Sequence, residues 1–250
     1  MKSALSKNSF TPPQSWQDLP LGEDVRRLIE IELSEVSRKF FGYHLVRLGQ
    51  LSSQLKLENC PINHKINLTP QEQIGSGLVA KSTELPIAEN SVDTFVLAHE
   101  LDFSHDPHQV LREVDRTIMP NGNLVLTGFN PFSLCGMFKY LPFNKGNVLH
   151  DARFFSCTRV KDWLHLLGFE VVEIKHLLFN ELFSRRRIHA PNKWNTWSIK
   201  HLGYFSSVYV IIAKKREIPL SIIKPKWKQS KPKFSTVNAS ARTGAMQNRQ

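Results

Sequence analysis

The run from Ser91 to His99 constrains the fold more than any other part of this sequence. It contains Val92, Phe95, Val96, Leu97 and Ala98 in almost unbroken succession. A strand that is buried on both faces of a parallel sheet has such a composition, whereas a half-exposed strand alternates apolar and polar residues. The run therefore predicts a central parallel strand, which must be covered by helices on both sides.

Other segments of the chain alternate between the strand and helix patterns. Strands are predicted at 43–49, 65–68, 78–80, 123–128, 169–177 and 204–213. Helices are predicted at 23–41, from Asp106-Pro107 onward with Asp106 as its cap, and at 158–167 with Thr158 as its cap. Pro120-Asn121-Gly122 is expected to form a turn. This order favours an α/β fold with a mainly parallel sheet and helices on both faces.

The positive charge of the chain is concentrated at its end. The formal net charge is +11, and the segment from Lys214 onward holds ten Lys or Arg residues and one acid, Glu217. We therefore expect three parts: a loosely ordered lead-in at 1–20, a folded domain at 21–217 and a basic, disordered tail at 218–250. The tail makes nucleic-acid association possible, but the rest of the chain shows no basic groove, so this reading is ranked last.

Several protein classes are disfavoured by composition. The three cysteines are Cys60, Cys135 and Cys157, which form no C-x-x-C pair, so neither a zinc site nor a disulfide framework is predicted. The N-terminus has no apolar signal segment, and the longest apolar run falls far short of the ~20 residues that span a bilayer. The default expectation is a cytoplasmic protein without a membrane segment.

Two blocks of sequence carry a family resemblance. Residues 84–97 read ELPIAENSVDTFVL, and residues 111–126 read LREVDRTIMPNGNLVL. Their order and spacing resemble class I S-adenosylmethionine-dependent methyltransferases, of the methyltransferase type 11 domain. The resemblance implies a Rossmann-like fold with a seven-stranded, mainly parallel sheet. It also implies S-adenosyl-L-methionine as the cofactor.

A longer signature narrows the resemblance. His99-Glu100-Leu101-Asp102-Phe103 and residues 128–134, GFNPFSL, look like the YafS-like branch of bacterial methyltransferase-like proteins. The resemblance extends over most of residues 15–225. It supplies a class of activity and leaves the methyl acceptor unidentified.

The resemblance also assigns cofactor-binding positions, and several of them hold unusual residues. The family places an acid and then Gly-x-Gly-x-Gly after the first strand, where this chain has Arg47, Gly49, Leu51 and Ser53. Leu51 would crowd the cofactor, because only glycine lacks a Cβ atom. Other cofactor positions fall on these residues: Asn67, which replaces the acid for the ribose hydroxyls; Lys81, which replaces the acid for the adenine amino group; and Ser82, Thr83 and His99.

Three residues are candidates for contact with the acceptor. His99 and Asp102 follow the fourth strand, where the family places residues near the reactive methyl group, and Asn130 follows the fifth. His99 could take a proton from a nitrogen or oxygen nucleophile, or it could simply cap the strand. Asp102 could orient the substrate. Asn130 could contact the substrate or serve only as a turn residue before proline.

A metal site near His99 is not expected. His99, His105 and His108 lie close in sequence, but a zinc-protease helix needs histidines four residues apart, and position 103 is Phe. Two main hypotheses therefore stay open. One is a methyltransferase with an unidentified acceptor, and the other is a non-catalytic binding protein on the same fold.

Overall fold

The structure is a computed structural model, which describes residues 12–72, 75, 77–133, 148–177 and 206–216. The chain divides between Glu217 and Ile218 into two units. All features below belong to the first unit. The basic tail predicted at 218–250 lies outside the described residues, so its disorder stays a prediction.

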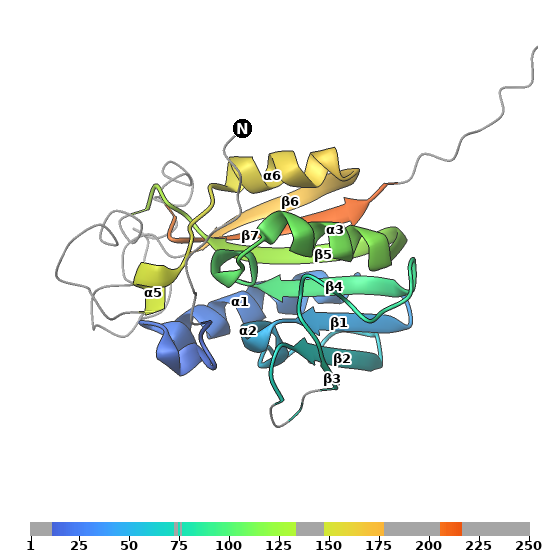
Figure 1. The fold of residues 1–250 in the computed structure, drawn as a ribbon, viewed down its shortest axis with the longest axis horizontal. Coiled ribbons are helices and arrows are strands. Elements are labelled where there is room, and N and C mark those ends of the chain that lie inside the picture. Colours follow the sequence, from blue (N-terminus) through green and yellow to red (C-terminus); the bar gives the residue numbers. More distant parts are fainter. Residues whose placement is uncertain (1–11, 73–74, 76, 134–147, 178–205, 217–250) are drawn as a thin grey trace, which may run out of the picture. The chain divides into compact units, whose positions relative to one another are not determined.

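The described chain forms one seven-stranded sheet in the order β3-β2-β1-β4-β5-β7-β6 (Figure 1). The strands are β1 (His44–Leu48), β2 (His64–Thr69), β3 (Leu78–Val79), β4 (Val92–Ala98), β5 (Ile118–Phe129), β6 (Phe169–Leu177) and β7 (Val208–Lys215). The five strands β3, β2, β1, β4 and β5, in this spatial order, are all parallel to their neighbours. Strand β7 runs antiparallel to both β5 and β6. The predicted fold class, a mainly parallel sheet of seven strands, is confirmed.

Helices cover both faces of the sheet. They are α1 (Gly22–Ser37), α2 (Gln50–Ser53), α3 (Pro107–Thr117), α5 (Val148–Asp151) and α6 (Cys157–Leu166), with short 3-10 turns η1 (Trp16–Asp18) and η2 (Leu101–Phe103). Val96 and Ala98 of β4 pack in one core cluster with α1, whereas Phe95 and Leu97 pack in the other with α3 and α6. This two-sided burial is why residues 95–98 of β4 are apolar without interruption.

Two details of the predicted elements are corrected. The cap of α6 is Ser156, whose side chain accepts a hydrogen bond from the Arg159 amide, and not Thr158. The predicted turn at Pro120-Asn121-Gly122 lies within β5 as an irregularity, where the register with β4 shifts. Asn121 adopts φ +62° there, a conformation that asparagine tolerates better than most residues. The predicted cap of α3 is confirmed, since the Asp106 side chain accepts from the Gln109 amide at 3.0 Å.

The described part of the expected lead-in is packed, not loose. Trp16 and Leu19 lie in the core with the residues of α1, and Trp16 is fully buried. The Trp16 indole N–H donates to the carbonyl oxygen of Leu51 at 3.0 Å. For residues 12–20 the prediction is wrong, because the prolines Pro12, Pro13 and Pro20 do not prevent packing here; residues 1–11 lie outside the described residues. In the fold, this polar and proline-rich segment is held by one buried aromatic ring and its hydrogen bond.

Candidate functional site

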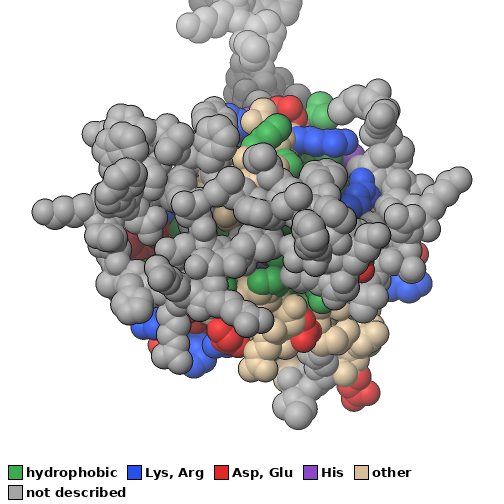
Figure 2. All heavy atoms as spheres, turned by 90° about the vertical axis from the view of Figure 1, so that its left-hand side faces the viewer, with side chains coloured by type: hydrophobic (Ala, Val, Ile, Leu, Met, Phe, Trp, Pro, Cys, Tyr) green, Lys and Arg blue, Asp and Glu red, His purple; other side chains and the backbone are tan. Residues whose placement is uncertain are grey.

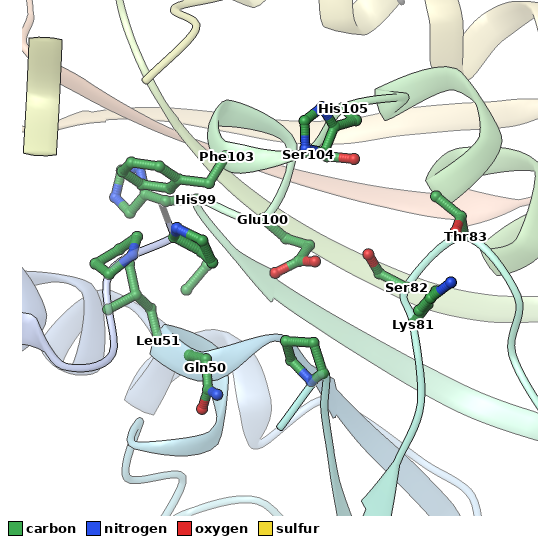
Figure 3. Close-up of a pocket in the computed structure, with 14 residues that line it drawn as sticks. Gln50, Leu51, Lys81, Ser82, Thr83, His99, Glu100, Phe103, Ser104 and His105 are labelled. Atoms are coloured by element: carbon green, nitrogen blue, oxygen red, sulfur yellow. The ribbon is translucent and has the colours of Figure 1, made fainter. Parts of the chain in front are cut away.

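A cavity of about 290 Å³ opens where parallel strands β1, β3 and β4 end (Figure 3). Strands β1 and β4 are neighbours, yet the chain leaves β1 toward β2 and returns at β4 only after β3. Such a reversal in strand order leaves a crevice at the carboxyl ends, which is where open α/β sheets bind ligands. The lining residues are Pro12, Pro13, Gln50, Leu51, Pro70, Lys81, Ser82, Thr83, Ala98, His99, Glu100, Phe103, Ser104 and His105.

Figure 2 views the molecule from the side at which these parallel strands end. Apolar, acidic and basic side chains of the described residues are all visible on this side. The cavity itself is lined by both polar and apolar groups, a mixture typical of small-molecule sites.

Gly49 does not line the cavity itself, but it lies between β1 and the lining residue Gln50 and packs against Glu100, which also lines it. It follows β1, adopts φ +96°, and donates its amide hydrogen to the carbonyl oxygen of Leu68 at 2.8 Å. A Cβ atom at this position would overlap the carboxyl group of Glu100. Both the positive φ and the close approach require glycine, so the one motif glycine that the sequence keeps is the one that the geometry needs.

Glu100 points into the cavity from the end of β4, and Ser82 lies across from it (Figure 3). Ser82 hydrogen-bonds to its carboxyl group, and burial is the dominant effect, raising the pKa of Glu100 above the ordinary value. Sequence reasoning missed this residue. Its only signal was its place beside His99 at a strand end, and no pattern indicates that the two side chains serve one site.

His99 and Asp102 form a buried pair beside the cavity. The His99 Nδ1 and Asp102 Oδ2 atoms are 2.9 Å apart, and both side chains are fully buried. The same Asp102 oxygen accepts the Phe129 amide hydrogen at 3.0 Å, and the Phe129 ring stacks on the imidazole with centroids 4.0 Å apart. Among the described residues, the Nε2 atom of His99 has no hydrogen-bond partner.

The backbone of His99 is also unusual. It adopts φ +54°, which is uncommon for a residue with a Cβ atom, and its amide donates to the Thr127 carbonyl oxygen at 3.1 Å. Non-glycine residues in such conformations cluster at functional sites, where the surrounding structure holds them in place. This chain turns sharply at the end of β4, which places His99 and Glu100 on the same crevice.

Two predicted cofactor residues lie away from the cavity lining. The Arg47 Nη1 atom donates to the carbonyl oxygen of Leu55 at 2.7 Å, and burial lowers the pKa of its guanidinium group. The Asn67 Nδ2 atom donates to the carbonyl oxygen of Gly75 at 2.6 Å. The prediction placed Asn67 at the end of its strand, but β2 continues to Thr69. The residue after this strand that lines the cavity is Pro70.

The remaining predicted residues divide between cavity and scaffold. Lys81, Ser82 and Thr83 line the cavity together with His99. Asn130 does not line it: the Asn130 carbonyl oxygen accepts from the Ser133 hydroxyl at 2.7 Å, and its side chain accepts from the Phe132 amide at 3.1 Å. The sequence left two roles open for Asn130, a substrate contact and a turn residue. These two hydrogen bonds are those of a turn residue.

Two further features of the described residues bear on the class of site. No helix among them is both long and apolar enough to cross a membrane. His, Cys, Asp and Glu side chains in the described ranges form no group of three that could hold a metal ion.

Comparison with known proteins places this geometry in a family. The methyltransferase-domain family matches residues 25–126. The chain is 34% identical over 238 residues to "Uncharacterized protein YafS" of Escherichia coli strain K12, covering 94% of each chain. The chain belongs to the methyltransferase-domain family of class I Rossmann-like proteins. Within that family it belongs to the YafS-like branch.

Solved structures share the fold at low sequence identity. An S-adenosylmethionine-dependent methyltransferase from Thermotoga maritima, a possible histamine N-methyltransferase, matches with a TM-score of 0.54 and 19% identity, over 77% of this chain and 91% of its own. The [4+2]-cyclase SpnF matches with a TM-score of 0.53 and 14% identity, over 85% of this chain and 86% of its own. The second match shows that this fold also serves a protein named for another reaction.

Proposed function

We propose that this protein is an S-adenosylmethionine-dependent methyltransferase that binds its cofactor in the cavity beside Gly49. The observation that carries the proposal is the position of the cavity at the strand-order reversal between β1 and β4. The membership in the methyltransferase-domain family supports the same reading. The acceptor is not identified, so the proposal names the cofactor and the type of reaction.

The residues of the cavity fit such a ligand. Leu51, Ala98 and Phe103 supply apolar surface, whereas Lys81, Ser82 and Thr83 supply hydrogen-bond donors. Glu100 supplies an acceptor, and its carboxyl group packs against the backbone of Gly49, where no Cβ atom is in the way. When bound, S-adenosylmethionine supplies an electrophilic methyl group to a nucleophile.

His99 is proposed as the proton acceptor of the site, with Asp102 as its positioning residue. If the imidazole N–H at Nδ1 donates to the Asp102 carboxylate, the lone pair lies on Nε2, the atom that has no partner among the described residues. A carboxylate thus selects the tautomer and holds the ring in place, as in other His–Asp pairs. The proton that a nitrogen or oxygen nucleophile loses on methylation would pass to Nε2.

Calorimetric titration tests the cofactor assignment without knowledge of the acceptor. S-adenosylmethionine and S-adenosylhomocysteine should both bind, and Ser82→Trp, which fills the cavity, should abolish binding. Thr158→Trp is a matched control, because Thr158 is exposed on α6, away from the cavity lining. No heat from either ligand at high micromolar concentration, with correctly folded protein, would overturn the proposal.

The second candidate is a non-catalytic binding protein on this fold. It is favoured by the observation that Arg47 and Asn67, which stand at acidic positions of the family, make structural contacts outside the cavity lining. It predicts that the native protein transfers no methyl group, so that His99→Gln changes only the stability of the fold and the affinity for a ligand. Radioactive methyl transfer to a component of a cell extract by the native protein, lost in His99→Gln, decides for the enzyme.

A further inference from the structure

The charge distribution of the cavity is uneven. Glu100 is the only carboxylate among the lining residues that the structure describes. The other titratable side chains that line the cavity are Lys81, which follows β3, His99 at the end of β4, and His105 before α3. One acid therefore faces an interior space whose other ionisable groups are basic.

The hydrogen bond from Ser82 does not offset the cost of burying the Glu100 carboxylate. Desolvation outweighs the Ser82 hydrogen bond, and the pKa of Glu100 is raised as a result. A carboxylate in such a place is stabilised most by a cationic group that also donates hydrogen bonds. A perturbed acid in a cavity is also a recognised sign of a functional site.

We infer that Glu100 binds the α-ammonium group of the cofactor and replaces the acid that is missing from β1. This inference rests on the proposed function. S-adenosylmethionine carries two cationic groups, a sulfonium and an ammonium, and only the ammonium can donate hydrogen bonds. The carboxylate of Glu100 can accept such bonds and offset the positive charge.

The sheet explains how an acid from β4 can serve the end of β1. These strands are adjacent and parallel, and Leu48 of β1 pairs with Leu97 of β4. Gly49 comes one residue after this pair and Glu100 three residues after it, on the sharp turn at His99. The carboxyl group of Glu100 therefore lies where a Cβ atom on residue 49 would be, directly over the backbone after β1.

The opposing possibility is that Glu100 blocks the cavity. Its side chain lies in the space next to Gly49, so a ligand there must either contact the carboxyl group or displace it. The two roles predict opposite effects of removing the charge. A binding group loses affinity on substitution, whereas a blocking group gains it.

The test is a titration of the native protein and Glu100→Gln with three ligands. S-adenosylmethionine and S-adenosylhomocysteine both carry the ammonium, whereas 5′-methylthioadenosine lacks the amino-acid part. Loss of a charge-assisted hydrogen bond predicts that Glu100→Gln weakens the first two roughly 10- to 100-fold. The affinity for 5′-methylthioadenosine should change less than about threefold.

A second measurement uses pH. Cofactor affinity of the native protein should fall as pH drops through the raised pKa of Glu100, because protonation removes the carboxylate. Glu100→Gln keeps Lys81, His99 and His105, so the difference between the two pH profiles isolates the contribution of Glu100. Equal profiles would overturn the assignment.

The outcomes separate this inference from the proposed function. If native protein binds no ligand, the proposed function fails. If native protein binds and Glu100→Gln binds S-adenosylmethionine equally or more tightly, only the role of Glu100 fails. Circular dichroism checks that the variant folds, and Glu100→Asp, which keeps the charge on a shorter arm, gives a second variant that should also weaken the two ammonium ligands.

Discussion

The two regions that build the crevice use their polar side chains differently. In residues 84–130, the side chains of the family motifs hold the scaffold, and the turn after β4 supplies His99 and Glu100 to the crevice. In residues 43–83, the motif positions Arg47 and Asn67 bind loop carbonyl groups instead of facing the cavity. The family match at residues 25–126 includes the second region and most of the first.

The difference teaches that an altered motif is not the same as a lost site. Arg47 and Asn67 donate hydrogen bonds to carbonyl oxygens of the segments that follow β1 and β2. The cavity keeps one acid, but this acid comes from the neighbouring strand. What matters to a ligand is the charge at a point in space, and adjacent parallel strands can supply it from either side.

The largest expected effect tests whether residues 43–83 depend on the N-terminal segment. Trp16→Ala removes a fully buried indole and its hydrogen bond to Leu51, and it should lower the free energy of unfolding by about 3–5 kcal/mol. Trp16→Phe keeps most of the packing and should cost about 1–2 kcal/mol. Urea denaturation measures both. Equal, small effects would mean that the segment does not support the loop after β1.

The next prediction concerns residues 84–130. Arg116 pairs with Glu113 at 2.8 Å and donates to the carbonyl oxygens of Leu85 and Ile87, so it clamps the loop before β4 to α3. Arg116→Ala should lower the free energy of unfolding by about 1–3 kcal/mol at pH 7. Arg116→Lys retains charge but not the forked geometry, and it should recover only part of the loss.

This clamp also has a pH signature. The hydrogen bond from Arg116 is the main cause that lowers the pKa of Glu113 below its ordinary value. A carboxyl group with a lowered pKa in the folded state stabilises the fold above its unfolded pKa, and this stabilisation is lost as pH falls through the folded value. The destabilising effect of Arg116→Ala, measured as a difference in Tm, should therefore shrink in acid. If the Tm difference between the native protein and Arg116→Ala stays constant as pH falls below the folded-state pKa of Glu113, this prediction is wrong.

A smaller effect is expected at Arg47. Arg47→Gln shortens the side chain and removes its hydrogen bond to Leu55, which should cost about 1 kcal/mol of stability. Cofactor affinity should change by less than about threefold, because Arg47 does not line the cavity. A tenfold change in affinity with unchanged stability would show that Arg47 acts on the ligand and would remove the contrast between the two regions.

The smallest effect is expected from restoring a family acid. Asn67→Asp places a carboxylate at the position expected for ribose recognition, but it removes the amide that donates to Gly75. We expect no gain in affinity for S-adenosylmethionine by titration, and a slight loss of stability. A gain of tenfold or more would indicate that residue 67 reaches the ligand and that the acid is truly missing.

The sequence by itself indicated seven strands, the helices α1, α3 and α6, and the edge at which the cavity opens. Buried strands must be apolar on both faces, caps and glycines mark where elements end, and these signals are local. His99 and the segment Lys81 to Thr83 could be placed at the crevice because they follow strand ends. Gly49 could be identified because it follows a predicted strand and stands at the first glycine position of the family motif.

Only the tertiary structure decided which polar side chains face the cavity. Trp16 packs on α2, Arg47 and Asn67 turn to loop carbonyl groups, and Glu100 bends back over Gly49. None of these contacts follows from spacing along the chain. Each depends on the register between strands and on the course of a loop, which are set by the packing of the whole domain, so the acid of this site could be found only in three dimensions.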